Sequence, residues 1–261
     1  MVLRILTLGD VVGQYGMSLL SGGRRLSSLR REYKADLVIA NGENAAPGNG
    51  IRPDDADTLF EAGCDVITGG NHTFRHRSVY SLLDECGAVM RPGNYPSSAP
   101  GCGYYIADVS GYRVLVMNLS GCAFMEPLAS PFETADRMLA DNEGRYDIAV
   151  LDFHAEATSE KIALARYLDG RVSAVFGTHT HVQTNDAEVL PGGTGYVTDI
   201  GMCGSMNGVL GVKTECILHK FTVKTPVTFE PAEGGGMIHG AYFDIDTADG
   251  KCVSCGLIKE G

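Results

Sequence analysis

Residues 148–154 read Ile148-Ala149-Val150-Leu151-Asp152-Phe153-His154, an apolar run that ends on a histidine. A run of this length is typical of a buried strand. A segment with a helical pattern follows it at residues 159–168. The same alternation of apolar runs and longer mixed segments fills the first two thirds of the chain, which predicts strands joined by crossover helices and an α/β fold.

The expected elements follow from this alternation. We predict buried strands at Ile5–Leu8, Leu37–Ala40, Val66–Thr68, Val114–Leu119, Ile148–Phe153 and Val172–Phe176. We predict helices near Met17–Tyr33, Pro53–Ala62, Ser78–Glu85, Phe132–Leu139 and Ser159–Leu168. From about Tyr196 the pattern shortens, and antiparallel strands are expected at Val227–Glu230, Met237–Asp246 and Val253–Ile258.

Length and composition indicate one globular domain over residues 1–261, with 44% hydrophobic and 20% charged residues. The short apolar stretch Met1–Leu8 is interpreted as a first strand and not as a signal peptide. No run approaches the ~18 apolar residues of a membrane span. We therefore expect a soluble, cytoplasmic protein.

The cysteines and the charge restrict the function further. Eight scattered cysteines are expected to be free thiols, and the pair Cys252 and Cys255 lacks the second pair that a zinc finger needs. The net charge of −11 opposes binding to long nucleic acids or anionic membranes. A small phosphate ester remains compatible with it, because bound cations reverse the local field.

Polar clusters stand at or near the carboxyl ends of the predicted strands, which is the sheet edge where α/β proteins bind ligands. The clusters are Gly9-Asp10-Val11-Val12-Gly13, Asn41-Gly42-Glu43-Asn44, Gly69-Gly70-Asn71-His72, Asp152-Phe153-His154 and Gly177-Thr178-His179-Thr180-His181. They supply a mixed oxygen and imidazole set: Asp10, Glu43, Asn44, Asn71, His154, His179 and His181. Such a set suits Mn, Fe or Zn better than a thiolate site does.

Each cluster also has an ordinary structural interpretation. Asp10 is a suitable helix N-cap, and Asn41-Gly42-Glu43-Asn44 resembles a plain turn. His154 alone is typical of a hydrogen-bonded histidine at a strand end. The two imidazoles of His179-Thr180-His181 point to one face of a strand, which favours a metal when the other clusters are considered.

Taken together, the motifs resemble those of the calcineurin-like metallophosphoesterases. Val12 stands where that superfamily usually has a histidine, and this departure is shared with the bacterial 2′,3′-cyclic nucleotide 2′-phosphodiesterases. The five segments that begin at Gly9, Asn41, Gly70, Asp152 and Gly177 resemble the motifs of that subfamily. Weaker similarity extends over nearly the whole chain.

The resemblance implies a fold of four layers, two mixed β-sheets flanked by helices, and a homo-oligomer. It implies that one metal ion is held by Asp10, Glu43, Asn44 and His181 and a second by Glu43, Asn71, His154 and His179. Glu43 would bridge the two ions, which are expected to be iron or manganese. His72 would stay uncoordinated and donate a proton to the leaving oxygen.

The expected function is therefore a dinuclear-metal phosphodiesterase that hydrolyses 2′,3′-cyclic nucleotides or similar small phosphodiesters by attack of a metal-bridging hydroxide. Two alternatives remain. One is a regulatory binding protein that uses the metal site as a ligand sensor, and the other is a phosphomonoesterase. A comparison of mono- and diester substrates with added Mn distinguishes them.

Overall fold

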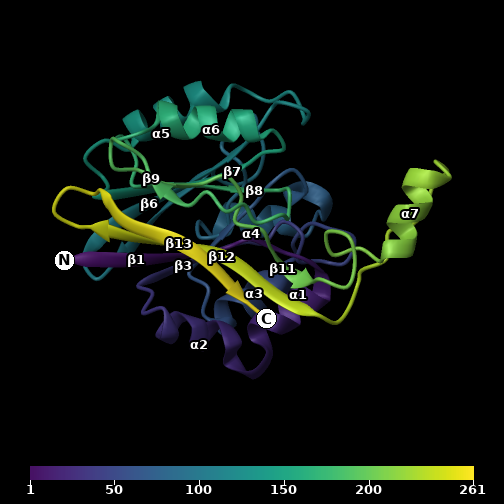
Figure 1. Cartoon of the computed structure of the whole chain (residues 1–261). Coiled ribbons are helices and arrows are strands. Elements are labelled where there is room, and N and C mark those ends of the chain that lie inside the picture. Colours follow the sequence, from purple (N-terminus) through teal and green to yellow (C-terminus); the bar gives the residue numbers. More distant parts are fainter.

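Two β-sheets pack face to face between two outer layers of helices in the computed structural model, which describes all 261 residues (Figure 1). Each sheet contains both parallel and antiparallel strand pairs. The expected α/β fold, with two mixed sheets flanked by helices, is confirmed.

The first sheet has the strand order β2-β11-β12-β1-β3-β4, and β13 pairs with β12. Its strands are β1 (Val2–Leu8), β2 (Asp10–Val11), β3 (Leu37–Asn41), β4 (Val66–Thr68), β11 (Met202–Ser205), β12 (Gly236–Asp246) and β13 (Cys252–Glu260). Strands β1, β3 and β4 are parallel, whereas β12 is antiparallel to β1. The first strand and the C-terminal hairpin therefore belong to one sheet.

The second sheet has the order β5-β6-β7-β8-β10-β9. Its strands are β5 (Tyr104–Val109), β6 (Tyr112–Ser120), β7 (Ile148–His154), β8 (Ala174–Thr178), β9 (Glu188–Val189) and β10 (Gly195–Val197). The four central strands are parallel, and the two edge strands are antiparallel to their neighbours.

Helices cover the outer face of each sheet. They are α1 (Gly13–Ser21), η1 (Gly22–Arg24), α2 (Arg25–Glu32), α3 (Pro53–Ala62), η2 (Thr73–Arg75), α4 (Val79–Glu85), α5 (Pro131–Asp141), α6 (Thr158–Tyr167) and α7 (Thr214–Thr222). Leu20, Leu29 and Leu59 are buried in the cluster between α1–α4 and the first sheet. Met138 and Leu164 join α5 and α6 to the second sheet. None of the helices has the length and apolar character that a membrane span requires.

Between the sheets lies a third apolar cluster to which both contribute. Phe176 of β8 and Phe243 of β12 face each other across it, with ring centroids 6.2 Å apart. Burying one such side chain contributes about 1.5–3 kcal/mol to stability. This core fixes how the carboxyl ends of the two sets of parallel strands face each other.

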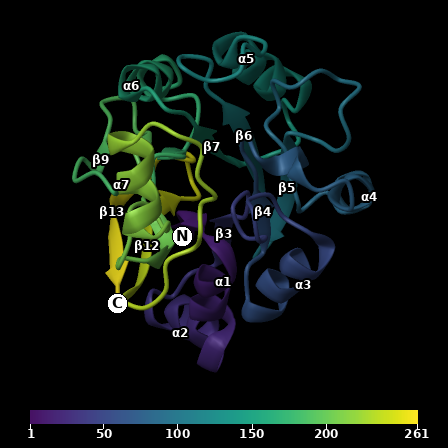
Figure 2. The ribbon, with the colours of Figure 1, turned by 90° about the vertical axis from the view of Figure 1, so that its right-hand side faces the viewer.

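The parallel strands of both sheets end at the same side of the molecule, which faces the viewer in Figure 2. Asn41 ends β3, Thr68 ends β4, His154 ends β7 and Thr178 ends β8. Asp10 follows β1 after a single residue. The polar clusters of the sequence are thereby gathered at one edge.

The predicted helix at Met17–Tyr33 is two helices, α1 and α2, separated by a break at Gly22-Gly23. Gly23 has φ 58° and Arg24 has φ 59°, which lie in the left-handed region that interrupts a helix. The strand predicted at Val227–Glu230 is wrong. These residues lie between Pro226 and Pro231 and form no ladder. The backbone pairing here is limited to an isolated bridge between Pro231 and Val212 and to the Glu230 carbonyl, which accepts from the N–H of Lys213 at 2.9 Å.

The helix α7 was not expected, because the sequence from Tyr196 onward favoured short strands. It projects away from the body of the molecule (Figure 1). The other two C-terminal strands were predicted within two residues of their observed bounds, as β12 and β13. All eight cysteines are free, and Cys252 is buried in β13 without a metal-binding neighbour pair.

Candidate metal centre

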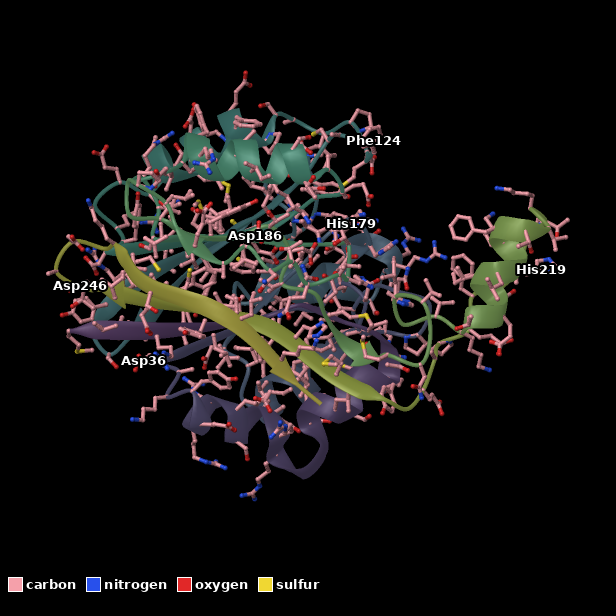
Figure 3. All side chains as sticks on the ribbon, in the orientation of Figure 1. Asp36, Phe124, His179, Asp186, His219 and Asp246 are labelled. Atoms are coloured by element: carbon pink, nitrogen blue, oxygen red, sulfur yellow. The ribbon has the colours of Figure 1, made fainter.

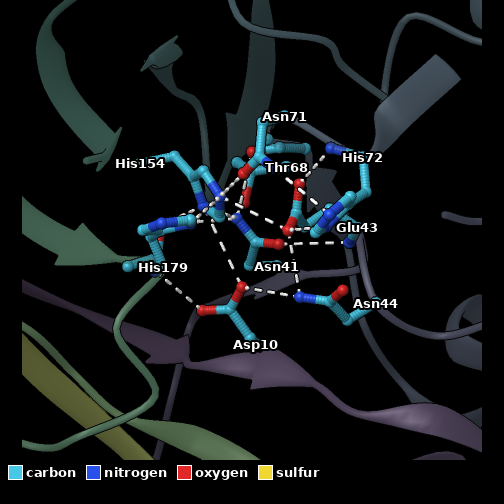
Figure 4. Close-up of polar contacts among 12 residues, drawn as sticks. Asp10, Asn41, Glu43, Asn44, Thr68, Asn71, His72, His154 and His179 are labelled. Atoms are coloured by element: carbon cyan, nitrogen blue, oxygen red, sulfur yellow. Dashed lines mark hydrogen bonds and ion pairs between the residues drawn. The ribbon is translucent and has the colours of Figure 1, made fainter. Parts of the chain in front are cut away.

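Seven polar side chains converge where the carboxyl ends of the two sheets meet (Figure 4). They are the residues that the sequence analysis put forward as ligands: Asp10, Glu43, Asn44, Asn71, His154, His179 and His181. The first four follow strands of the first sheet, and the three histidines come from strands of the second sheet or directly follow one. The cluster therefore bridges the two sheets.

Glu43 lies at the centre of this cluster and is 1% exposed. Its Oε1 lies 3.3 Å from His154 Nε2 and accepts a hydrogen bond of 3.0 Å from Asn44 Nδ2. A Cβ on Gly70 would lie 2.3 Å from Glu43 Oε2 and 2.3 Å from His154 Nε2. Only glycine at position 70 leaves room for this approach.

One half of the cluster consists of Asp10, Asn44 and His181. His181 Nε2 lies 3.6 Å from Asp10 Oδ1, and Asn44 Nδ2 lies 3.3 Å from His181 Nε2 and 3.4 Å from Asp10 Oδ1. Asn44 thus presents its amide nitrogen to the other two side chains. To coordinate a cation, this amide has to turn over so that Oδ1 faces Asp10 and His181.

The other half consists of Asn71, His154 and His179. His154 Nε2 lies 3.0 Å from Asn71 Oδ1 and 3.1 Å from His179 Nδ1. Single ligand atoms of Glu43, His154 and His179 all lie within 4.8 Å of one another. This separation matches three ligands of one cation.

Hydrogen bonds on the far side of each imidazole orient the two rings. The Thr178 hydroxyl donates to Asp152 Oδ1 at 2.7 Å, so its oxygen is free to accept from His154 Nδ1 at 2.9 Å. His179 Nε2 lies 3.1 Å from a carboxylate oxygen of Glu156. With their protons on these outer nitrogens, His154 Nε2 and His179 Nδ1 would each present a lone pair to a cation at the centre, as metal-binding histidines require.

The electrostatics of the site favour a positive charge at its centre. Burial raises the pKa of Glu43, but the charge of His154 and hydrogen bonds from His154 and His72 outweigh burial and hold that pKa well below its usual range. Burial lowers the pKa of His154, but Glu43 and Asp10 raise it to about 9. The buried carboxylates of Asp10 and Glu43 pair with histidines and have no lysine or arginine partner.

His179 behaves differently from His154. Burial, followed by the charge on His154, lowers the pKa of His179 to about 4, so its ring is neutral at pH 7. A neutral imidazole is the form that binds metals. Buried carboxylates, inward-facing imidazole lone pairs and amide oxygens make a donor set that fits divalent cations, and no basic side chain occupies its centre.

His72 lies beside this set but turns its ring outward. Its Nδ1 lies 2.9 Å from Glu43 Oε1, and its backbone N–H donates to Glu43 Oε2 at 2.7 Å. Its Nε2 lies 3.4 Å from Asn49 Nδ2 near the surface, and the side chain is 34% exposed. Asn71 Nδ2 lies 3.3 Å from the same Nε2, so two amide groups face the outer nitrogen of this ring.

A buried ion pair between Lys161 and Asp199 supports the turn that carries His179 and His181. Both histidines have left-handed backbone angles, φ 95° and φ 63°. Asp199 accepts from the Thr180 hydroxyl at 2.8 Å and from Lys161 Nζ at 2.7 Å. Lys161 also donates to the carbonyl of Thr178 at 2.8 Å, so the turn is fixed on both sides.

Several supporting residues were missed by the sequence analysis as site residues. Asn41 donates to Asp152 Oδ2 at 3.0 Å and accepts from the backbone N–H of Glu43 at 3.1 Å. Asp152 is fully buried, and burial, opposed by His154 and hydrogen bonds, raises its pKa to about 6. Both residues stand inside motifs that the sequence analysis had singled out, and that position is the signal that pointed to them.

Comparison with known proteins identifies close relatives over the full fold. A family model described as YmdB-like protein matches residues 6–258. The chain is 43% identical over 251 residues to the 2′,3′-cyclic-nucleotide 2′-phosphodiesterase of Bacillus subtilis (strain 168), covering 96% of this chain and 94% of that protein.

Two solved structures are similar over almost their whole length. A hypothetical protein from Thermus thermophilus is 41% identical with a TM-score of 0.92, and 99% of each chain is covered. A protein from Mycoplasma pneumoniae described as a novel phosphatase is 31% identical with a TM-score of 0.93, covering 100% of this chain and 94% of that one. The resemblance inferred from the motifs is confirmed.

Proposed function

The chain belongs to the YmdB-like family, and we propose on this basis that it is a metal-dependent phosphodiesterase that hydrolyses 2′,3′-cyclic nucleotides or similar small phosphodiesters. The name of the Bacillus subtilis relative supports the substrate class. The observation that carries the proposal is the central position of Glu43, which contacts Asn44 on one side and His154 on the other. A carboxylate in this position is suited to two cations at once.

The ligand set divides between two ions, which we propose to be iron or manganese. Asp10, Asn44 and His181 would hold one ion, Asn71, His154 and His179 would hold the other, and Glu43 would be shared. When bound, the two ions supply Lewis acidity toward the phosphate and lower the pKa of the attacking water. Each ion takes ligands from both sheets, and the whole chain, residues 1–261, would act as one domain.

His72 is the proposed proton donor. Its contact with Glu43 at Nδ1 fixes the ring, and Nε2 is the atom left to protonate the departing ribose oxygen. Loss of the bond to the 2′-oxygen would leave a nucleoside 3′-phosphate. Asn49 Nδ2 at 3.4 Å and Asn71 Nδ2 at 3.3 Å from Nε2 would have to yield this nitrogen to the leaving oxygen.

A paired set of variants tests the proposal. Metal content and hydrolysis of 2′,3′-cyclic AMP are measured for the wild type and for Glu43→Gln and His181→Ala, with Glu61→Gln on α3 and Glu85→Ala on α4 as exposed controls. We expect about two ions per wild-type chain, and loss of metal and hydrolysis only in the first two variants. Full activity of the metal-stripped chain would refute the proposal, and hydrolysis of monoesters alone would favour a phosphomonoesterase. Binding of 2′,3′-cyclic AMP without turnover would favour a ligand sensor.

We also propose that the protein is a cytoplasmic homo-oligomer in which α7 packs against a second copy. The helix exposes Leu218 (56%) and Phe221 (67%), and a nine-residue helix without packing is marginally stable. Lys220 and Lys224 make this arm basic in a chain of net charge −11, so its charge complements the rest of a second copy. Free thiols suit a reducing compartment. Light scattering of the wild type and of Phe221→Glu tests the assembly, and a monomeric wild type would contradict it.

A further inference from the structure

An open cavity of about 590 Å³ is lined by residues of α5 and of the two loops that precede β5 and α5. None of the proposed metal ligands lines it, and neither does His72. The loop before β5 approaches α5 so closely that a Cβ on Gly93 would lie 2.8 Å from Met138 Sδ. The cavity therefore has a lining that shares no residue with the proposed ligand set, and its size is typical of small-molecule sites.

Arg91 lies in the wall of this cavity and is only 6% exposed. Its guanidinium donates to two backbone carbonyls, from Nε to Pro100 at 3.2 Å and from Nη1 to Pro92 at 2.8 Å. It forms no ion pair with a carboxylate, and Nη2 has no partner in the protein. Burial of this charge lowers the pKa of Arg91. A buried cation without a counter-charge is costly unless a ligand supplies one.

Arg137 of α5 provides a second guanidinium in the lining of the cavity. Its side chain is exposed and makes neither an ion pair nor a hydrogen bond within the protein. Asp141 is the single acidic residue of the lining, so the charged side chains carry a net positive charge. Planar guanidinium groups bind phosphate through parallel hydrogen bonds.

The rest of the wall is apolar and aromatic. It includes Tyr95, Tyr104, Leu128 and Met138. The hydroxyl groups of both tyrosines lack a hydrogen-bond partner in the protein, and burial, followed by Glu126 and Glu43, raises the pKa of Tyr95 to about 12. A flat heterocycle fits this wall, with phenolic hydroxyls available to its polar edge.

We propose that the cavity is a second ligand site that binds a nucleoside monophosphate, with Arg91 and Arg137 on the phosphate and the aromatic wall against the base. Arg91 also ties the ends of its own loop through the carbonyls of Pro92 and Pro100. That structural role accounts for Nε and Nη1 only. It does not require Nη2, or a second arginine across the cavity.

Cys102 provides a local reporter, because its thiol lines the cavity and is exposed. The full-length, metal-loaded protein is alkylated with and without adenosine 5′-monophosphate, and the rate at Cys102 is followed by peptide mass spectrometry. We expect the nucleotide to slow alkylation at Cys102 and not at Cys86, which lies outside the cavity lining. Adenosine and inorganic phosphate alone should protect about tenfold more weakly, since each lacks one half of the contacts.

Variants then assign the protection to the two arginines. Arg137→Gln, on the surface of a helix, and Arg91→Lys, which keeps the charge but loses the planar group, should each abolish protection at the same nucleotide concentration. Arg31→Gln, an exposed arginine of α2, serves as the matched control. Unchanged protection in Arg137→Gln, or equal protection by adenosine and the nucleotide, overturns the proposal.

One further variant separates this site from the proposed catalytic one. Glu43→Gln should leave the protection of Cys102 intact, and loss of protection in that variant would mean that the nucleotide binds at the metal centre and not in the cavity. If Glu43→Gln instead retains full hydrolysis, the proposed function fails while the cavity proposal stands. The cavity proposal is therefore tested by the protection of Cys102, and the proposed function is tested by hydrolysis.

Discussion

Lys161 and Asp199 form an ion pair with Nζ 2.7 Å from Oδ2, and both side chains are 1% exposed. The pair supports the turn that carries His179 and His181. Replacing Lys161 by methionine leaves a buried carboxylate without its partner, which costs about 3–5 kcal/mol. Urea denaturation should show this decrease in the free energy of unfolding. The double variant Lys161→Met/Asp199→Asn should recover part of the lost stability. Equal stability of wild type and Lys161→Met would contradict the expectation.

Thr178 fixes the ring of His154 by accepting from Nδ1 at 2.9 Å. In Thr178→Val this acceptor is lost, and the lone pair on Nε2 is no longer held toward the centre. We expect metal affinity to fall about 10–100-fold, as for other partners of metal-binding histidines. Competition with a chelator measures the affinity. Thr7→Val, at a buried threonine of β1, is the matched control and should bind metal normally. A normal affinity in Thr178→Val would argue against this role.

Gly70 tests how tightly the centre is packed. A methyl group at this position would lie 2.3 Å from both Glu43 Oε2 and His154 Nε2, so Gly70→Ala has to displace one of them. We expect loss of hydrolysis and of metal binding. Gly22→Ala is the control, because Gly22 has open space around it and an ordinary φ of −62°. Hydrolysis by Gly70→Ala at the wild-type rate would show that the ligands adjust freely.

The start of α3 gives a prediction about pH. Burial raises the pKa of Asp55, but hydrogen bonds from Arg52 outweigh burial and lower it. A lowered pKa in the folded state means that the stabilisation is complete above the unfolded value of about 3.9 and is lost as pH falls through the folded value. The free energy of unfolding of Asp55→Asn should therefore be about 1 kcal/mol lower than that of the wild type at neutral pH, a value typical of a helix cap. In strong acid the two should be equally stable. Urea denaturation measures the free energy of unfolding, and Asp57→Asn, exposed on the same helix, is the control and should match the wild type at neutral pH.

Phe124 is expected to contribute to substrate binding. It is 91% exposed, has a left-handed φ of 63°, and projects from the β6–α5 loop at the end of the molecule where His179 lies (Figure 3). The backbone N–H groups of Cys122 and Ala123 donate to Glu160 and hold the loop. Stacking on a base is worth about 1–3 kcal/mol, so Phe124→Ala should raise KM for 2′,3′-cyclic AMP about tenfold with kcat unchanged. Phe229→Ala is the control, and an unchanged KM in Phe124→Ala would exclude the stacking role.

The sequence predicted six of the parallel strands and the residues at their ends, because both signals are local, but it missed the short strands β2, β10 and β11. The apolar run Ile148–Phe153 and the terminal His154 are read from seven neighbouring positions. The supporting bonds were not predicted, since Asp199 meets Lys161 across 38 positions and Asn41 meets Asp152 across 111. Contacts at such separations depend on how the strands are ordered.

The errors in the fold have equally specific causes. The periodicity of Met17–Tyr33 is continuous across Gly22-Gly23, but the left-handed backbone of Gly23 divides the helix. The edge strand β5 was not predicted; it pairs only with β6, and its residues are mostly half-buried without a regular alternation. The helix α7 buries only Cys216, so its sequence carries no apolar stripe facing a core that would have predicted a helix.

If the proposed ligand set binds metal, its division between the two sheets would make the metal a cross-link as well as a catalyst. Asp10, Glu43, Asn44 and Asn71 come from one half of the sandwich, and the histidines come from the other. An unfolded chain cannot assemble such a set, so binding free energy adds to folding free energy by mass action, and the midpoint of thermal unfolding rises with the concentration of free ion. Starvation for metal would therefore cost the cell the protein itself as well as its activity.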